Sequence, residues 1–335
     1  MKRLIPAILL VATLGVAPVV AQLPDISDYK SGLQSFSDEF ATSLPMNSTI
    51  GLNWSDAYVG QLLPIPSLGI GITTGVTTVP GDVFTSLLDD LNIEPSSGAL
   101  ESIGSAGLPI PGYAIDARIG GLVLPFDVGL KFGTLPGLSV GDVDVEYQNI
   151  GADIRYAILD GGVLPKVSVG VGYNRLSGRI STPLGIGTQS FNNGVSGRGR
   201  AEAELTDPEL ALDWTANVFD VRLQASKSFL IVEPHIGLGA TFGSAETTAG
   251  LESNATLRVD SGSGLQTVDA SEFEQASGLD VSGNTVGVTS TANPFTVRAF
   301  GGASLNLTVI RIDLGLMYNL SSGSLGGTLG TRFQI

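Results

Sequence analysis

The chain of 335 residues contains no cysteine, and His235 is its single histidine. The absence of cysteine excludes a disulfide framework, a thiolate metal site and catalysis by a thiol. One histidine is too little for a histidine-rich metal site or a pair of catalytic histidines. From these absences we expect neither a cofactor nor a metal.

Charge is also scarce, at 15% of the residues against roughly 25% in an ordinary soluble domain. Hydrophobic residues nevertheless make up 43% of the chain, the mean hydropathy is +0.30, and there are 45 glycines. Beyond the N-terminus the apolar runs stay well short of the roughly 20 residues that a membrane helix needs, which excludes a helical membrane bundle. The net charge of −15 argues against nucleic acid as a partner, because an acidic surface repels phosphates. This composition is typical of a β-barrel that faces lipid.

The N-terminus has the features of a cleaved signal peptide over residues 1–21. Lys2 and Arg3 form a basic start, residues 4–16 are mostly apolar, and small residues at 19–21 suit a cleavage site. The apolar stretch is short and contains prolines at both ends, which argues against a helical anchor. We therefore expect export, and the loss of two basic residues makes the exported chain more acidic still.

Residues 22–47 are predicted to form an N-terminal helical segment. Tyr29, Leu33, Phe36 and Phe40 recur at the spacing of one helix face, and Pro45 is expected to end the helix. The segment could lie free in the periplasm or plug a barrel.

After this segment, apolar and polar residues alternate with a period of two, which predicts β-strands. The alternating segments are often longer than ordinary strands, and their polar positions are rich in Gly, Ser, Thr and Asn, which favours a lipid-facing barrel over a soluble sandwich. We predict an all-β fold over residues 48–335, a transmembrane antiparallel up-and-down β-barrel of about 12 strands, with 10–14 allowed. The segments are 113–123, 126–132, 143–158, 167–173, 232–242, 297–309, 312–320 and 325–335, with weaker ones at 48–60, 66–78 and 209–227.

Three connections, 79–111, 179–208 and 244–293, are long and are expected to be extracellular loops. The last is strongly acidic. A solvated, flexible surface is the simpler interpretation of its charge, and cation binding or adhesion is the alternative.

Charged residues recur on the predicted inner face, and residues two apart on a strand share that face. Within 143–158 the alternation slips by one position, which predicts a bulge inside one strand or a turn between two. Asp144 and Glu146 are then placed inside with Asp153 and Arg155. The lumen is then nearly neutral, and its charges act either as ties between strands or as the transverse field of a pore for small solutes. The lumen-facing candidates are Asp116, Arg118, Asp127, Lys131, Asp144, Glu146, Asp153, Arg155, Lys166, Arg222, Glu233, His235, Arg298, Arg311, Asp313 and Arg332.

A catalytic site is not expected among these residues. His235 beside Glu233, with Ser226 or Ser228 near in sequence, contains the residue types of a hydrolase triad. A single lumen histidine is more simply an ordinary hydrogen-bonding residue, so we predict no enzymatic activity. Trp54 and Trp214 are interpreted as anchors at the membrane interface.

The signal peptide, the alternating strands and the terminal Phe333-x-Ile335 together resemble the outer-membrane β-barrel proteins of two-membrane bacteria. The resemblance implies location in the outer membrane, contact with its lipid, and recognition of the C-terminal strand Leu325–Ile335 by the barrel assembly machinery. The mixed charges and the Gly, Ser and Thr residues of the predicted inner face favour a porin-like passive channel for small solutes. The alternatives are a closed barrel that displays acidic loops for surface contact, and a barrel with an N-terminal plug, which is similar to the long-chain fatty-acid transporters.

Overall fold

The computed structural model describes residues 26–62, 65–81, 107–121, 125–140, 143–160, 162–183, 187–192, 200–260, 264–277, 279–282 and 285–335. The predicted signal peptide over residues 1–21 and most of the predicted connection 79–111 lie outside these ranges. Within them the chain is mainly β-strand, with helices α2 (Ile26–Ser48) and α5 (Ala270–Ser277). The predicted all-β class is confirmed.

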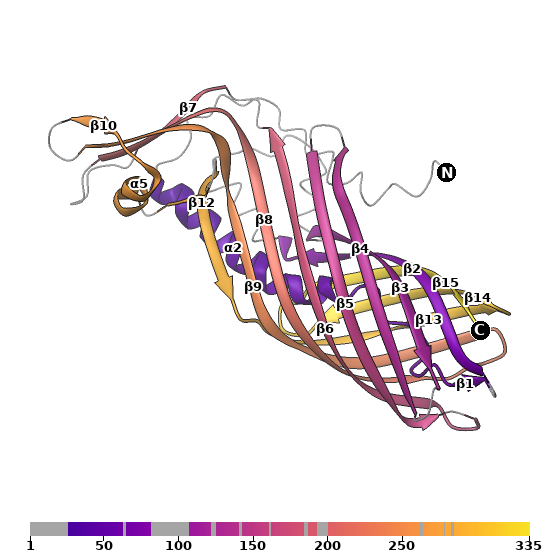
Figure 1. The fold of residues 1–335 in the computed structure, drawn as a ribbon. Helices are drawn as coiled ribbons and strands as arrows, with labels where there is room; N and C mark the ends of the chain where they lie inside the picture. Colours follow the sequence, from indigo (N-terminus) through magenta and orange to yellow (C-terminus); the bar gives the residue numbers. More distant parts are fainter. Residues whose placement is uncertain are drawn as a thin grey trace.

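The strands form a closed antiparallel ring, in which the last strand pairs with the first (Figure 1). The described residues contain ten strands in this ring, at the low end of the predicted range. The expected 12 was too high because segment 48–60 does not form a strand. The ring consists of β2 (Ile65–Val79), β3 (Leu108–Gly120), β4 (Phe126–Val140), β5 (Val143–Asp160), β6 (Lys166–Pro183), β8 (Arg200–Ser226), β9 (Val232–Asp260), β13 (Phe295–Leu307), β14 (Ile310–Asn319) and β15 (Leu325–Gln334).

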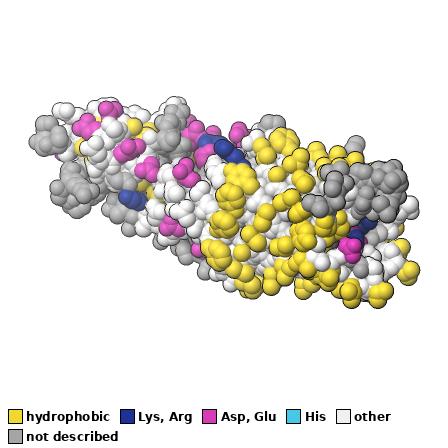
Figure 2. All heavy atoms as spheres, turned by 60° about the horizontal axis from the view of Figure 1, so that its bottom comes forward, with side chains coloured by type: hydrophobic (Ala, Val, Ile, Leu, Met, Phe, Trp, Pro, Cys, Tyr) yellow, Lys and Arg dark blue, Asp and Glu magenta, His cyan; other side chains and the backbone are white. Residues whose placement is uncertain are grey.

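The outer face of the ring carries an apolar band. Along the lower part of β8, Phe219, Val221 and Leu223 point outward and are 41–50% exposed, whereas Asp220 and Arg222 point inward and are buried. Figure 2 shows hydrophobic side chains, in yellow, gathered over the visible face of the barrel. Large apolar side chains stay exposed on a whole belt only when lipid covers them. The ring is therefore a membrane-spanning barrel.

A row of aromatic residues marks one edge of the band. Tyr173, Phe219, Phe242 and Phe295 are cross-strand neighbours on β6, β8, β9 and β13. The ring centroids of Tyr173 and Phe219 lie 5.2 Å apart, and those of Phe219 and Phe242 lie 5.5 Å apart. We call these four residues the aromatic row. Aromatic side chains favour the boundary between lipid and water, so the strands leave the membrane here.

Beyond the aromatic row the inner face of the strands becomes apolar and the outer face becomes polar. On β8, Trp214 and Ala216 now point inward and are buried, while Asp213 and Thr215 face out. The outer face therefore meets lipid on one side of the row and water on the other. The inner face correspondingly changes from a polar lumen to an apolar core.

This exchange corrects the prediction for β5. The pairing of β5 with β6 is continuous from Asp144 to Ala157, without a slip where a bulge was expected. Asp144 and Glu146 are exposed on the outer face, and Val145 and Tyr147 are buried. Side chains alternate between the two faces along the whole of β5, but the outward-facing ones change from apolar to polar beyond the aromatic row. Asp144 and Glu146 therefore do not face the lumen.

The strands beyond the aromatic row form a folded extension rather than long loops. Residues 244–260 continue β9, residues 200–208 belong to β8, and residues 179–183 belong to β6, so much of the predicted loops 244–293 and 179–208 is strand. We call this part the extension. Its further elements are β7 (Gln189–Asn192), β10 (Leu265–Thr267), α5, β11 (Asp280–Ser282) and β12 (Thr285–Ala292).

Helix α2 packs against the inner face of the extension (Figure 1). Its predicted apolar face is confirmed, because Leu33, Phe36 and Phe40 are buried, and the rings of Phe40 and Trp214 lie 5.5 Å apart. Trp214 thus belongs to this core and not to the membrane interface. The helix continues past Pro45 to Ser48, so the prediction that Pro45 ends it was wrong by one turn. Neither α2 nor α5 is long and apolar enough to cross a membrane.

The lipid-facing band can be tested by one substitution placed on either side of the aromatic row. Leu223→Arg puts a charge on the outer face of β8 within the band, and we expect it to lower the free energy of unfolding by about 2–4 kcal/mol. The matched control Thr215→Arg lies on the same strand and face, beyond the row, and should cost about 0–1 kcal/mol. Unfolding of both variants in lipid vesicles by denaturant checks this. Equal losses would contradict the placement of the band.

Candidate functional site in the barrel lumen

Residues 49–60 begin with a turn and then run through the lumen without helix or strand, from the end of α2 to β1 (Gln61–Leu62), which pairs with β2. We call residues 49–60 the lumen segment. Inward-facing glycines make room for it, because a Cβ at Gly69 would collide with Trp54 and one at Gly112 with Ile50. The segment that was predicted as a weak strand therefore fills the barrel instead of joining its wall.

Asp56 is the centre of the first charge cluster in the lumen. Its carboxylate is fully buried and accepts two hydrogen bonds from Arg311 Nη1 at 2.8 Å and one from Arg332 Nη2 at 2.8 Å. Lys166 Nζ approaches the same carboxylate at 3.4 Å. Glu233 Oε2 lies 3.2 Å from Arg311 Nη1. The lumen segment thus supplies a carboxylate that three strand cations need.

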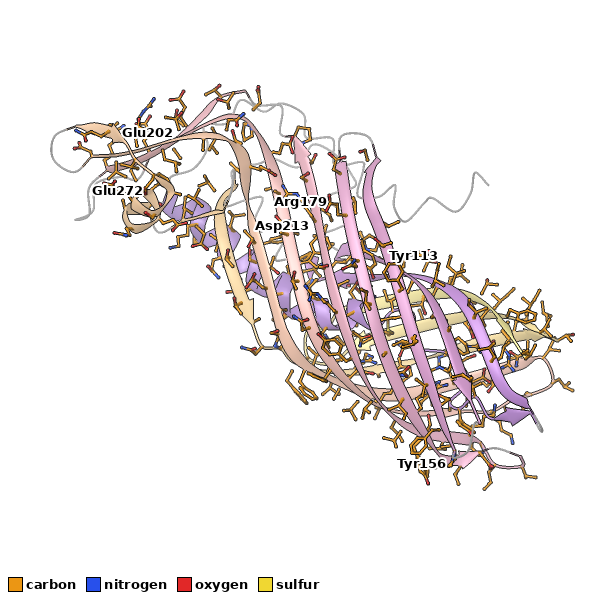
Figure 3. The ribbon with its side chains drawn as sticks, in the orientation of Figure 1. Tyr113, Tyr156, Arg179, Glu202, Asp213 and Glu272 are labelled. Carbon is orange, nitrogen blue, oxygen red and sulfur yellow. The ribbon has the colours of Figure 1, made fainter. Side chains whose placement is uncertain are left out.

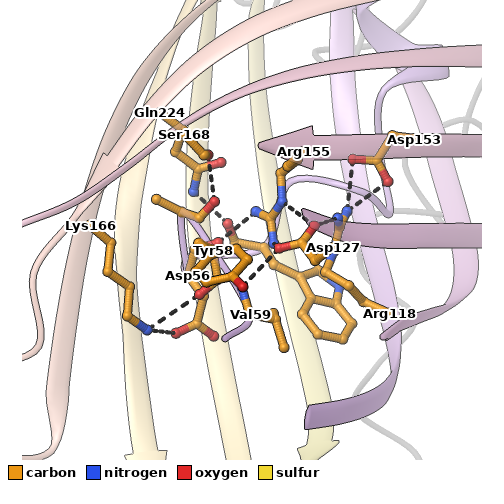
Figure 4. Close-up of polar contacts among 12 residues, drawn as sticks. Asp56, Tyr58, Val59, Arg118, Asp127, Asp153, Arg155, Lys166, Ser168 and Gln224 are labelled. Carbon is orange, nitrogen blue, oxygen red and sulfur yellow. Dashed lines mark hydrogen bonds and ion pairs between the residues drawn. The ribbon is translucent and has the colours of Figure 1, made fainter. Parts of the chain in front are cut away.

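Asp127 is the centre of a second cluster, which Figure 4 shows beside the first. Its oxygens accept hydrogen bonds from Arg155 Nε and Nη2, both at 2.8 Å, and Arg118 forms a further short ion pair with it. The backbone N–H of Val59 donates to the same carboxylate at 2.8 Å. Arg118 also bridges to Asp153 at 2.7 Å. This cluster therefore ties β3, β4 and β5 to the lumen segment.

Trp54 lies between two guanidinium groups. The Cζ atom of Arg332 is 4.4 Å from the ring centroid and that of Arg118 is 5.6 Å from it. The indole Nε1 donates to Asp116 at 2.6 Å. Trp54 is buried, so the prediction of an anchor at the membrane interface was wrong. Its ring stacks with cations and its N–H is satisfied, which is how a buried tryptophan is stabilised.

A third group of charges connects β8 with β5 and β13. Asp220 accepts from Arg298 Nη1 at 2.7 Å and from Arg222 Nη1 at 3.0 Å, and Arg222 forms a short ion pair with Asp153. All four side chains are buried. These contacts are the interstrand ties that the sequence predicted for part of the lumen.

Lys131 joins the wall to the end of α2. Its Nζ donates to the carbonyl of Ile50 at 2.8 Å and forms a shorter bond with the carbonyl of Ser48, the last residue of the helix. The final carbonyls of a helix lack internal partners and carry partial negative charge, so a buried ammonium group stabilises them. Lys131 thus fixes the point at which the helix becomes the lumen segment.

We expect Lys131→Met to loosen that point. The substitution keeps an unbranched side chain but removes two charge-assisted hydrogen bonds, each of which contributes about 1.5–3 kcal/mol. Hydrogen exchange of the amides at residues 46–50 should become faster, and Lys131→Arg should restore part of the protection. Unchanged exchange in Lys131→Met would show that the bonds do not hold the helix end.

The residue types of a hydrolase triad meet in the lumen but are engaged otherwise. Ser226 Oγ donates to Glu233 Oε1 at 3.0 Å and accepts from the backbone N–H of Ala57, also at 3.0 Å. The ring of His235 lies beside that of Phe300, with centroids 6.5 Å apart. Ser226 is used as a tie to the lumen segment, and the prediction of no enzymatic activity stays a prediction.

Most sequence candidates face the lumen, and two acidic residues that sequence reasoning missed complete the charge pattern. Asp220 could have been found, because it alternates with Phe219 and Val221 on β8. Asp56 could not, because its segment resembled a strand. The inward-facing candidates are Asp116, Arg118, Asp127, Lys131, Asp153, Arg155, Lys166, Arg222, Glu233, His235, Arg298, Arg311, Asp313 and Arg332.

Comparison with known proteins gives similarity at the level of solved structures alone. No protein-family model and no curated protein matches the chain. The translocator domain of the autotransporter NalP from Neisseria meningitidis is 11% identical, with coverage of 92% of this chain and 99% of that one and a TM-score of 0.29. The toluene transporter TodX from Pseudomonas putida is 9% identical, covering 94% and 99%, with a TM-score of 0.25. LpxR from Salmonella typhimurium is 8% identical, covering 80% and 99%, with a TM-score of 0.25.

These TM-scores are too low to support any inference about activity. The fold rests on the closed ring, the apolar band outside it and the charged residues inside it. The chain is a transmembrane antiparallel β-barrel whose lumen is occupied by its own residues 49–60.

Proposed function

We propose that this protein is an outer-membrane barrel that is closed at membrane depth and anchors a folded, acidic interaction domain at the cell surface. The observation that carries the proposal is the burial of Asp56, whose carboxylate is fully covered and bound by Arg311, Arg332 and Lys166. A buried charge that loses its partner costs about 3–5 kcal/mol. Opening the lumen would require the lumen segment to leave all of these contacts, so the closed state is the stable one. An open passive pore is the weaker interpretation.

The orientation follows from the connections between strands. At one end of the barrel, which we call the turn end, the connections are the short stretches 121–125, 161–165, 227–231 and 308–309. Bacterial barrels have short turns on the periplasmic side and longer elements outside. We therefore place the turn end in the periplasm and the extension outside the cell.

The extension is rich in carboxylates, which favours a cationic partner. Figure 3 places Glu202 and Glu272 near its far end and Asp213, next to Arg179, nearer the barrel. Figure 2 shows acidic side chains gathered over the extension and nearly missing from the visible apolar band. Carboxylates on a projecting surface attract cationic groups over distances of about 10 Å at moderate salt.

The proposal is tested by conductance and by binding. Purified wild-type protein in planar bilayers should give no discrete conductance steps, and regular steps would overturn the closed state. Cells that display the protein should bind fluorescent oligolysine in a salt-sensitive manner. Glu146→Gln, Glu246→Gln and Glu272→Gln together replace exposed carboxylates and should reduce that binding. Unchanged binding would contradict the proposal that the extension binds a cationic partner.

A gated channel is the second candidate, and one specific observation favours it. The lumen segment is held by side chains of the wall, as where Gln224 Nε2 donates to the carbonyls of Trp54 and Ser55 at 2.6 and 3.2 Å. Such contacts can break without opening the ring of strand pairs. Conductance that appears in the wild-type protein after a ligand is added would support this function.

We propose that an assembly machinery recognises the C-terminal strand before the ring of strands closes. In the finished barrel β15 pairs with β14 on one side and β2 on the other. Ile335 and Leu68 also exchange two backbone hydrogen bonds of 2.9 Å. Both edges are then used, so a partner that reads Leu325–Ile335 by strand pairing must act earlier.

A further inference from the structure

The described chain passes through the whole barrel before its first strand joins the ring. Helix α2 starts at the extension, where Asp38 accepts a short hydrogen bond from Ser290 of β12. The chain then follows β3 from the extension end to the turn end. Along this path Asn47 Nδ2 donates to the carbonyl of Ile110 at 3.0 Å, Trp54 Nε1 donates to Asp116 at 2.6 Å, and Val59 lies against Gly120.

The two ends of the described chain consequently lie at opposite ends of the molecule. Ile335 is at the turn end, bonded to Leu68 near the start of β2. Ile26 begins α2 beside the extension, far from the C-terminus in Figure 1. Because Leu33, Phe36 and Phe40 are buried in the core of the extension, the helix cannot turn back toward the turn end without exposing that face.

The lumen also provides what an extended chain needs in order to cross a membrane. A backbone without secondary structure cannot pass through lipid, because its N–H and C=O groups would lose their hydrogen bonds. Here the wall supplies the missing partners. Arg155 Nη1 donates to the carbonyl of Asp56 at 2.6 Å, and Gln224 and Ser168 donate to the carbonyls of Trp54, Ser55 and Ala57.

We propose that the barrel holds its own N-terminal portion across the membrane, so that the start of α2 is presented at the outer surface of the cell. This inference rests on the proposed function for its orientation, with the turn end in the periplasm. The lumen segment then has two roles: it closes the lumen, and it carries the chain across the membrane. The acidic extension and the start of α2 together face the outside.

Single cysteines test the inference without background, since the chain contains none. Ser35 lies on the exposed face of α2, Thr256 is exposed on β9 in the extension, and Val163 is 96% exposed in a short turn at the turn end. Each variant, Ser35→Cys, Thr256→Cys and Val163→Cys, is treated with a membrane-impermeant maleimide in intact cells and again after permeabilisation. Retained heat-modifiable mobility on a gel confirms folding.

We expect Ser35→Cys and Thr256→Cys to be labelled in intact cells, and Val163→Cys to be labelled after permeabilisation alone. Labelling of Thr256→Cys without Ser35→Cys would overturn the inference and leave the orientation intact. Labelling of Val163→Cys with both others shielded would mean an inverted barrel, and would overturn the orientation as well. An epitope inserted before Ile26 should bind antibody on intact cells, and its protection would overturn the presentation of the N-terminal portion.

Discussion

Asp56→Asn should convert a silent barrel into a conducting one. The substitution removes the negative charge that Arg311, Arg332 and Lys166 share and leaves the shape of the side chain almost unchanged. Breaking a buried ion pair from one side costs about 3–5 kcal/mol. We expect this cost to act on the lumen segment first, because the ring is held separately by strand pairing. Planar bilayers should show discrete steps that the wild-type protein does not give.

Asp207→Asn is the matched control for that experiment. Asp207 is exposed in the extension and has a φ of 46°, a conformation that asparagine also adopts. It undergoes the same chemical change but forms no ion pair with any residue that the structure describes, so its bilayers should remain silent. If Asp56→Asn is also silent and exchanges hydrogen in residues 49–60 no faster than wild type, the Asp56 cluster does not hold the lumen closed.

Trp54→Ala should release the lumen segment by a different route. It removes a large buried ring between Arg118 and Arg332, and such truncations cost about 3–5 kcal/mol. The carboxylate of Asp116 also loses the indole donor at 2.6 Å. We expect hydrogen exchange at Ala57 and Val59, whose amides donate to Ser226 and Asp127, to become faster.

Trp54→Phe separates the two contributions of the tryptophan. Phenylalanine keeps a ring between the guanidinium groups but has no N–H, so Asp116 Oδ1 loses its donor while Thr73 still donates to Oδ2. The expected loss is about 1–3 kcal/mol. Trp214→Ala makes the same truncation in the core of the extension and should leave exchange at Ala57 and Val59 unchanged. Equal acceleration by Trp54→Ala and Trp214→Ala would mean that the lumen segment and the extension open as one unit.

The sequence was a good guide to the strands that face lipid and a poor one beyond them. Alternation such as Phe219, Val221 and Leu223 predicts a strand and the side it shows to lipid. The same rule fails at Asp144 and Glu146, because it assumes one environment outside the strand along its whole length. The same rule missed the strands of the extension. Their apolar side chains point inward and their outward side chains are polar, so these residues were predicted to be loops.

The site was predictable where it belongs to the wall and not where it belongs to the lumen segment. Arg118, Asp127 and Arg155 face inward as their spacing indicates. Leu52, Trp54 and Tyr58 recur at every second position as in a weak strand, and period-two alternation does not say whether the segment pairs with a neighbour. What decides is the space available inside the ring, which depends on glycines of the barrel wall, such as Gly69 and Gly120.

The aromatic row also has a consequence for how the register of β8 and β9 is set. A shift of one residue in a strand moves every side chain to the opposite face. Here such a shift would put Asp220 and Arg222 into lipid and, farther along the strand, Trp214 into water. The two halves of the strand would fail for opposite reasons at the same time. The correct register of β8 and β9 is therefore favoured by both halves of each strand, in the membrane and in the extension.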